Sequence, residues 1–168
     1  MRKLIALAMS SLLAACGLQP MYAGGGSGAV AQGLAAIDVA SIEGKAGWLV
    51  RNALVDRLGM STDQGVSPRY RLDVRLDDRL EGFALLSDDT IGRERRTLRA
   101  RYQLVDVSSG DIVLDASAGS DAGIDVVSSE YATIAAEQTA LENLAKDVAD
   151  RIVTNIALEL RTSGAESP

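Results

Sequence analysis

The chain has 168 residues, with 17 Lys or Arg against 23 Asp or Glu, and this acidic balance argues against general nucleic-acid binding, which depends on neutralising phosphates. It contains no histidine, one cysteine and 4% aromatic residues, so it lacks the commonest general base, the usual zinc ligands and a stacking platform for bases or sugars. Without histidine and without a G-x-S-x-G motif, a hydrolase is poorly supported.

The N-terminus has the layout of a secretory signal over residues 1–15. A short positive region at residues 2–3 precedes an apolar run at residues 4–13 (LIALAMSSLL), and the small residues 14–15 lead to Cys16. The apolar run is too short to span a bilayer as a stable helix. This layout predicts that the chain is exported.

The tetrapeptide at residues 13–16 (LAAC) resembles the lipobox of bacterial lipoproteins. The resemblance implies that the Cys16 thiol is acylated, that the leader is removed just before it, and that several acyl chains give durable anchoring. Gly17 stands where lipoproteins retained in an inner membrane typically carry Asp, so the implied destination is the outer membrane, facing the periplasm. The alternative is an ordinary signal peptide cut at an A-x-A-like site, with Cys16 a bystander.

Two short segments precede the first predicted helix. Residues 16–33 are predicted to be a lipid-anchored flexible tether, because the stretch at 24–33 (GGGSGAVAQG) is rich in glycine and buries little. A short strand is predicted over about residues 35–42, where apolar and polar residues alternate.

A helix is predicted over residues 45–58 (KAGWLVRNALVDRL), with Gly59 as its C-terminal stop. Trp48 is interpreted as a core residue rather than as an anchor for a partner. The apolar face of this helix carries Val50, Ala53, Leu54 and Leu58.

Alternation of apolar and charged residues predicts a long antiparallel hairpin. Residues 69–76 (RYRLDVRL) alternate without interruption, and the strand is expected to continue through residues 81–86. A turn at residues 87–90 leads to a return strand over residues 91–106.

A third strand and a long helix complete the domain. After a turn at residues 108–111, the strand is predicted over residues 112–117, and residues 120–128 are predicted to be a loop. The helix is predicted over residues 129–161, with Ser128 or Ser129 as its cap. Inward-facing positions are predicted at Ile112, Leu114 and Ala116 of the strand and at Ile134, Leu141, Leu144, Val148, Ile152 and Ile156 of the helix.

This order of elements predicts an α+β fold. The economical arrangement is a two-layer sandwich, in which two helices pack on one face of a four-stranded, mostly antiparallel sheet. The domain is expected to span residues 34–161, with a disordered tail at residues 162–168. The outer sheet face is polar by pattern and stays available for a ligand or partner.

The arginine-rich run at residues 93–101 (RERRTLRAR) is the feature of the sequence that most clearly suggests a binding site. On an extended strand all of its arginines except Arg96 share one face, and Arg binds phosphates and carboxylates bidentately. The alternatives are a solvated face whose arginines pair with Asp73, Asp77 and neighbouring acids, or contact with a partner protein. The candidate residues are Arg93, Arg95, Arg96, Arg99 and Arg101.

Carboxylates gather near the expected hairpin tip, at Asp77, Asp78, Glu81, Asp88 and Asp89. They could suggest an acid/base pair or a calcium loop, but they lack the ligand spacing of an EF-hand. They are interpreted as solubilising charges, and no catalytic residue, cofactor site or metal site is predicted.

Several segments, in one order along the mature chain, carry a family resemblance. They are CGLQPMY after the leader, RNALVDRL in the first helix, an Arg-rich return strand, YQLVD with SSGDIVLDAS, and SEYATIAAE followed by LAKDVADRI and LEL. In these the chain resembles the LPS-assembly lipoprotein family LptE, and its alphaproteobacterial branch in particular. The resemblance implies a non-enzymatic subunit of the outer-membrane LPS translocon, which plugs the LptD β-barrel, assists its assembly and binds LPS. The arginines of residues 93–101 then become candidate contacts for LPS or for the barrel.

The alternative function is a free-standing, lipid-anchored periplasmic binding module for LPS, peptidoglycan or a small ligand. Co-purification separates the two hypotheses, because a plug should be purified from detergent extracts together with a large barrel protein, in stoichiometric amounts.

We expect the mature protein to begin at an acylated Cys16 and to lack residues 1–15, and intact-mass analysis of the membrane fraction measures both features. Normal processing and membrane fractionation of a Cys16→Ala protein would contradict the lipobox interpretation. Because a tight barrel partner could retain unacylated protein, the measured mass rather than the fractionation decides.

Overall fold

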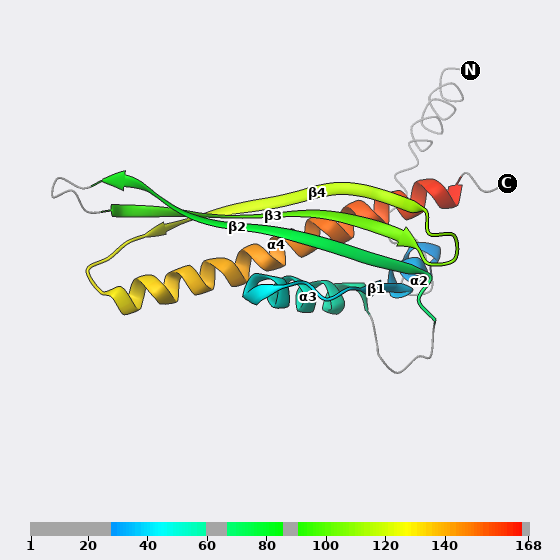
Figure 1. Ribbon diagram of the computed structural model, residues 1–168, viewed down its shortest axis with the longest axis horizontal. Helices are drawn as coiled ribbons and strands as arrows, with labels where there is room; N and C mark the ends of the chain where they lie inside the picture. Colours follow the sequence, from blue (N-terminus) through cyan, green and yellow to red (C-terminus); the bar gives the residue numbers. More distant parts are fainter. Residues whose placement is uncertain (1–27, 60–66, 86–90, 166–168) are drawn as a thin grey trace, which may run out of the picture.

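The computed structural model describes residues 28–59, 67–85 and 91–165 (Figure 1). The predicted leader, Cys16 and the predicted turn at residues 87–90 lie outside the described residues. None of the helices in the described part of the chain is long and apolar enough to cross a membrane. In chain order the elements are α2 (Ala29–Ala35), β1 (Ile37–Val39), α3 (Gly44–Leu58), β2 (Tyr70–Leu85), β3 (Ile91–Asp106), β4 (Ile112–Asp125) and α4 (Glu130–Ala165).

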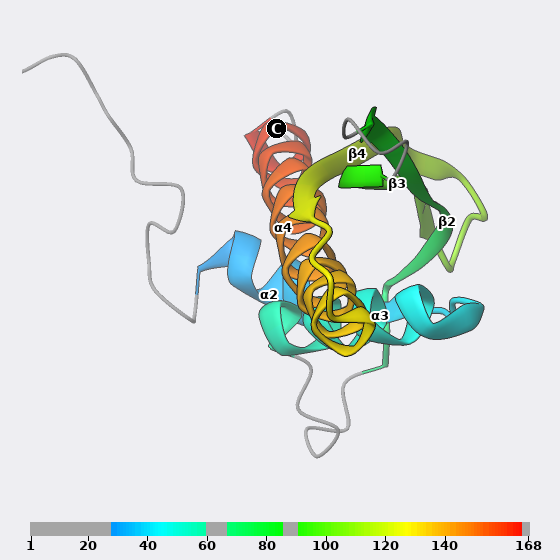
Figure 2. The same cartoon turned by 90° about the vertical axis from the view of Figure 1, so that its left-hand side faces the viewer.

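The strands form one sheet in the order β1-β2-β3-β4, and α3 and α4 lie on one side of it (Figure 2). β2, β3 and β4 make an antiparallel meander, as their alternating sequence predicts. β1 pairs in parallel with the start of β2, because α3 carries the chain across between them. This arrangement confirms the predicted α+β two-layer sandwich and adds α2 as a third, short helix.

The core lies between the inner sheet face and the two long helices. Leu72 on β2 pairs with Leu104 on β3, which pairs in turn with Leu114 on β4. Leu72, Leu104 and Tyr102 are fully buried, and the Tyr102 hydroxyl accepts a 2.9 Å hydrogen bond from Asn155 Nδ2 on α4. Because side chains alternate along a strand, burying this set places the intervening residues on the opposite face of the sheet.

α3 ends where the sequence predicts, at Gly59, which has a left-handed backbone with φ 67°. The predicted apolar face is buried at Val50, Ala53, Leu54 and Leu58. Trp48, in contrast, is 64% exposed, so its interpretation as a core residue is wrong. At 3.6 residues per turn Trp48 lies roughly 200° around the helix from Val50, which is the solvent side.

α4 supplies most of the helical part of the core. Leu144 and Val148 are 1% and 0% exposed, which confirms their predicted burial. Ile134, however, is 55% exposed, so its predicted core position is wrong. Lys45, at the start of α3, donates a hydrogen bond to Gln138 on α4, so the turns of α4 before Gln138 extend beyond the start of α3 and lack that packing partner.

β4 runs to Asp125, so the predicted loop at residues 120–128 is wrong over its first part. This stretch is rich in small and polar residues and lacks the alternation that identifies a strand from sequence. Its register with β3 is nevertheless continuous from Ala118↔Ala100 to Asp125↔Arg93. The ladder of backbone hydrogen bonds to β3 therefore overrides the weak local signal.

The start of β4 also departs from the prediction. Ile112 is 54% exposed rather than inward-facing, while Leu114 and Ala116 pack against the core as expected. The register shifts by one residue between Leu104 and Val105 of β3, opposite this point. A bulge of this kind turns the side chain of the residue beyond it to the opposite face of the sheet. Ile112 therefore pairs with Val105 on the outer face.

The helices extend into both predicted disordered ends. α2 makes residues 29–33 of the predicted tether helical, and it buries Leu34. A Cβ atom on Gly33 would lie 3.0 Å from Leu160 Cδ1, which shows how closely α2 approaches α4. α4 continues through residues 162–165 of the predicted tail.

Replacing Leu144 by Ala should lower the free energy of unfolding by about 2–5 kcal/mol, because it leaves a cavity between α4 and the sheet. Ile134→Ala on the exposed start of the same helix is the matched control and should change it by less than about 0.5 kcal/mol. Urea unfolding measures both. Equal effects would show that α4 packs by a different face.

Candidate ligand-binding face

The candidate site is the sheet face that α3 and α4 leave uncovered, named the outer face. Every second residue of the three long strands points to it, and most of these residues are charged. The charged and polar ones are Arg71, Asp73, Arg75, Asp77, Arg79 and Glu81 on β2, Arg93, Arg95, Thr97, Arg99, Arg101 and Gln103 on β3, and Asp115, Ser117, Asp121 and Asp125 on β4.

Asp73 and Asp77, two outer-face carboxylates of β2, bind arginines of their own strand. Arg71 donates two hydrogen bonds of 3.1 Å and one of 3.0 Å to the Asp73 carboxylate. Arg79 binds Asp77, with 3.0 Å between Nη2 and Oδ2. The predicted alternative, in which the arginines of the return strand pair with Asp73, Asp77 and neighbouring acids, is therefore wrong for Asp73 and Asp77, although cross-strand pairs with neighbouring acids do occur.

Two of the candidate arginines instead bind acids of β4. Arg93 Nε lies 2.8 Å from Asp125 Oδ1, and Arg101 Nη2 lies 3.2 Å from Asp115 Oδ2. Hydrogen bonds from Arg101 and then from Gln103 lower the pKa of Asp115 below its ordinary value. The carboxylate therefore stays ionised at neutral pH and neutralises Arg101.

Arg95 makes weaker contacts than Arg93 and Arg101. Its Nε is 4.0 Å from Asp121 Oδ2, the outer limit of an ion pair. Its guanidinium carbon lies 5.3 Å from the centroid of the Phe83 ring, a cation–π contact at the end of β2. Both the guanidinium and the ring remain largely exposed, so Arg95 stays accessible to an anion.

Arg96 has a structural role and lies on the inner face, as the strand alternation predicts. Its Nη2 is 2.7 Å from Asp78 Oδ2, and its Nη1 donates a 3.3 Å hydrogen bond to the Glu137 carbonyl on α4. The Arg96 side chain is 17% exposed. This residue ties β2, β3 and α4 together and is not part of the outer face.

Arg99 and Arg75 are the outer-face arginines that, within the described residues, have neither a hydrogen bond nor an ion pair to a side chain of this protein. Arg75 stands directly opposite Arg101, and two like charges in that position destabilise a sheet. The stem of Arg99 lies over Gly119, where a Cβ atom would be 3.2 Å from Arg99 Cγ. Sequence reasoning missed Arg75, although counting the register back through the hairpin could have placed it beside Arg101.

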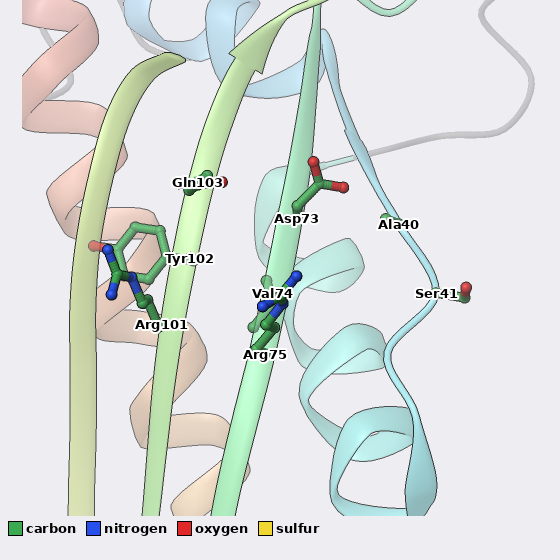
Figure 3. Close-up of a pocket in the computed structure, with 8 residues that line it drawn as sticks. All are labelled: Ala40, Ser41, Asp73, Val74, Arg75, Arg101, Tyr102 and Gln103. Atoms are coloured by element: carbon green, nitrogen blue, oxygen red, sulfur yellow. The ribbon is translucent and has the colours of Figure 1, made fainter.

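A hollow of about 590 Å³ opens on the outer face beside β1. Arg75 and Arg101 reach it from neighbouring strands, next to Asp73 and Gln103 (Figure 3). The chain after β1, at Ser41, forms the other side. The short length of β1 exposes this part of β2, so the hollow offers guanidinium and amide donors to an anionic group.

The hairpin acids that the structure describes are not assembled into a metal site. Asp77 binds Arg79 and Asp78 binds Arg96, while Asp88 and Asp89 lie outside the described residues. Within the ranges that the structure describes, no group of three acidic, His or Cys side chains is placed to hold a metal ion.

A family model described as "LptE: Lipopolysaccharide-assembly" matches residues 34–156. The chain belongs to the LptE family. LptE proteins are non-enzymatic lipoproteins of LPS assembly, and their family places this chain among lipoproteins of the outer membrane. The resemblance seen in the sequence is thereby confirmed.

Solved structures share the LptE fold. A candidate lipoprotein from Caulobacter crescentus CB15 is 28% identical, with a TM-score of 0.63 over 79% of this chain and 96% of that one. A minor lipoprotein from Acinetobacter baumannii is 15% identical, with a TM-score of 0.52 over 73% and 90%. The rare lipoprotein B from Shewanella oneidensis is 14% identical, with a TM-score of 0.51 over 78% and 98%. No curated protein matches the chain significantly.

Replacing Arg96 by Met should lower the free energy of unfolding by about 1–3 kcal/mol, because it leaves the half-buried Asp78 carboxylate without its partner. Arg93→Met removes an exposed pair on the same strand and should cost about 1 kcal/mol or less. Chemical denaturation of both variants makes the comparison. A larger loss for Arg93 would mean that the structural role assigned to Arg96 is wrong.

Proposed function

We propose that this LptE-family protein is the lipoprotein subunit of an outer-membrane LPS translocon. It is anchored through acylated Cys16, plugs and helps to assemble an LptD-type β-barrel, and binds LPS. The match to the LPS-assembly family over residues 34–156 supports a role in LPS assembly. The uncovered outer face is the single structural observation that carries the finer proposal.

A plug inside a barrel has to present a polar surface, because the lumen of a transmembrane β-barrel is polar. The outer face meets this need along most of β2, β3 and β4, apart from the apolar pair of Val105 and Ile112 at one end, while the apolar core residues are buried on the other side of the sheet. Most of its charges are already compensated within the chain, as at Arg93 with Asp125. A surface of paired charges can face a polar wall without leaving many uncompensated ions.

Arg75 and Arg99 are the residues that suit LPS binding, with Arg95 and Arg101 beside them. LPS carries clustered phosphates and carboxylates, and a guanidinium binds such groups with two parallel hydrogen bonds. Within the described residues neither Arg75 nor Arg99 has an acidic partner, so an anion can bind without displacing one. It would also relieve the repulsion between Arg75 and the facing Arg101.

A detergent pull-down of the full-length tagged protein, followed by mass spectrometry, tests the plug assignment. A large β-barrel protein in stoichiometric amount is the expected result. Its absence, with LPS binding retained, would favour the free-standing binding module instead.

Changing Arg75 and Arg99 together to Glu should sharply reduce binding of purified LPS, and the loss should be largest at low salt, where charges are least screened. Folding should survive, because both side chains leave the outer face. Arg151→Glu with Arg161→Glu on the exposed side of α4 makes the same charge change elsewhere and should leave LPS binding intact. If the double variant no longer associates with the barrel but binds LPS normally, these arginines contact the barrel wall rather than LPS.

A further inference from the structure

β4 has a free edge. It is the last strand in the sheet order, with β3 on one side, and no described strand pairs with its other side. A strand edge carries backbone donors and acceptors that can pair with another extended chain.

The register shows which backbone groups of β4 point away from the sheet. The Val126 N–H donates a 3.0 Å hydrogen bond to the Gly92 carbonyl, one residue beyond the pair of Asp125 with Arg93. In an antiparallel ladder hydrogen-bonded pairs recur at every second residue. The groups that face the free edge therefore belong to Ser117, Gly119, Asp121, Gly123 and Asp125.

The free edge of β4 has few of the features that usually prevent pairing, because Asp121 is the one charged side chain between residues 116 and 123. From residue 116 to residue 123 its side chains are those of ASAGSDAG, and its register with β3 shows no shift in that stretch. β2 also has an edge unpaired beyond Leu72, but that edge carries large charged side chains at alternate positions and an irregular register near Gly82. Large charges and bulges block edge pairing, so β4 is the receptive edge.

Two hollows lie along the seam between this edge and α4. The first, of about 440 Å³, is lined by three carboxylates, Asp121, Asp125 and Asp147, and by no Lys or Arg. Arg93 and Arg95 approach the first two from the β3 side, but within the described residues Asp147 makes no ion pair. The second, of about 420 Å³, is lined by Arg151 and by Asp150, whose carboxylate is already bound by Arg57, so the acidic character of the seam is confined to the first hollow.

From this edge and its acidic seam, we propose that β4 binds an extended, basic segment of a partner polypeptide, which adds to the sheet as a further strand. Main-chain hydrogen bonds would supply the affinity, and cationic side chains beside Asp147 would supply the preference. A second copy of this chain fits poorly, because its formal net charge is −6 and its own β4 is acidic. The inference does not depend on the proposed role in LPS transport.

A synthetic peptide of alternating valine and lysine is the probe, tested against the full chain by calorimetry and by amide hydrogen exchange. It should bind and slow exchange of the N–H groups of Ser117, Gly119, Asp121 and Gly123. The same peptide with glutamate in place of lysine, and a version N-methylated at alternate amides, should show no measurable binding. Equal binding of the lysine and glutamate peptides, or no slowing in β4, would overturn the proposal.

Variants of the β4 edge provide a second test of the proposal. Gly123→Lys adds an edge-blocking charge where a Cβ atom has no neighbour within 4 Å, and Ser117→Pro removes one outward N–H. Both should abolish peptide binding with an unchanged melting temperature, whereas Arg161→Glu on α4 should have no effect. Asp147→Lys should weaken the lysine peptide and favour the glutamate peptide. Unaltered binding by a folded Gly123→Lys protein would disprove pairing at this edge, even if Ser117→Pro failed to fold.

Discussion

The packing of α4 against a single face of the sheet is the constraint on which the rest of this structure depends. Leu144, Val148 and Ile152 are buried on the helix side, opposite Leu98, Tyr102 and Leu104 of β3. Since strand side chains alternate, each buried residue fixes the exposure of its neighbours. An outer face with charges along three strands is the direct consequence of a one-sided core.

The charges on that face are largely balanced inside the chain. Acids of β4 bind arginines of β3, and acids of β2 bind arginines of β2, so an acidic protein can carry many arginines without a strong positive field. Exposed pairs of this kind contribute little to stability, and they are more useful as a way of keeping the surface polar. What distinguishes Arg75 and Arg99 is therefore not their charge but the lack of a partner in the described part of the chain.

The two free edges of the sheet differ in the side chains that they carry. β2 carries arginine and acid side chains beside its open edge, while residues 116–123 of β4 are alanine, serine and glycine apart from Asp121. The small residues also let the Arg99 stem lie across Gly119, which a Cβ atom would obstruct. The same composition thus shapes the outer face and leaves an accessible backbone.

Sequence by itself determined the fold class, the ends of α3 and the polar character of the outer face. Each follows from a local pattern: apolar spacing at 3.6 residues, alternation at two, or a glycine at a helix end. Tertiary structure decided the rest. The strand beyond residue 117 exists because β3 offers a ladder to it. Trp48 is exposed because it lies on the solvent side of α3, and Ile134 is exposed because the first turns of α4 extend beyond α3. The partners of the arginines were also decided there, because register between strands depends on a bulge and on hairpin geometry that no single strand encodes.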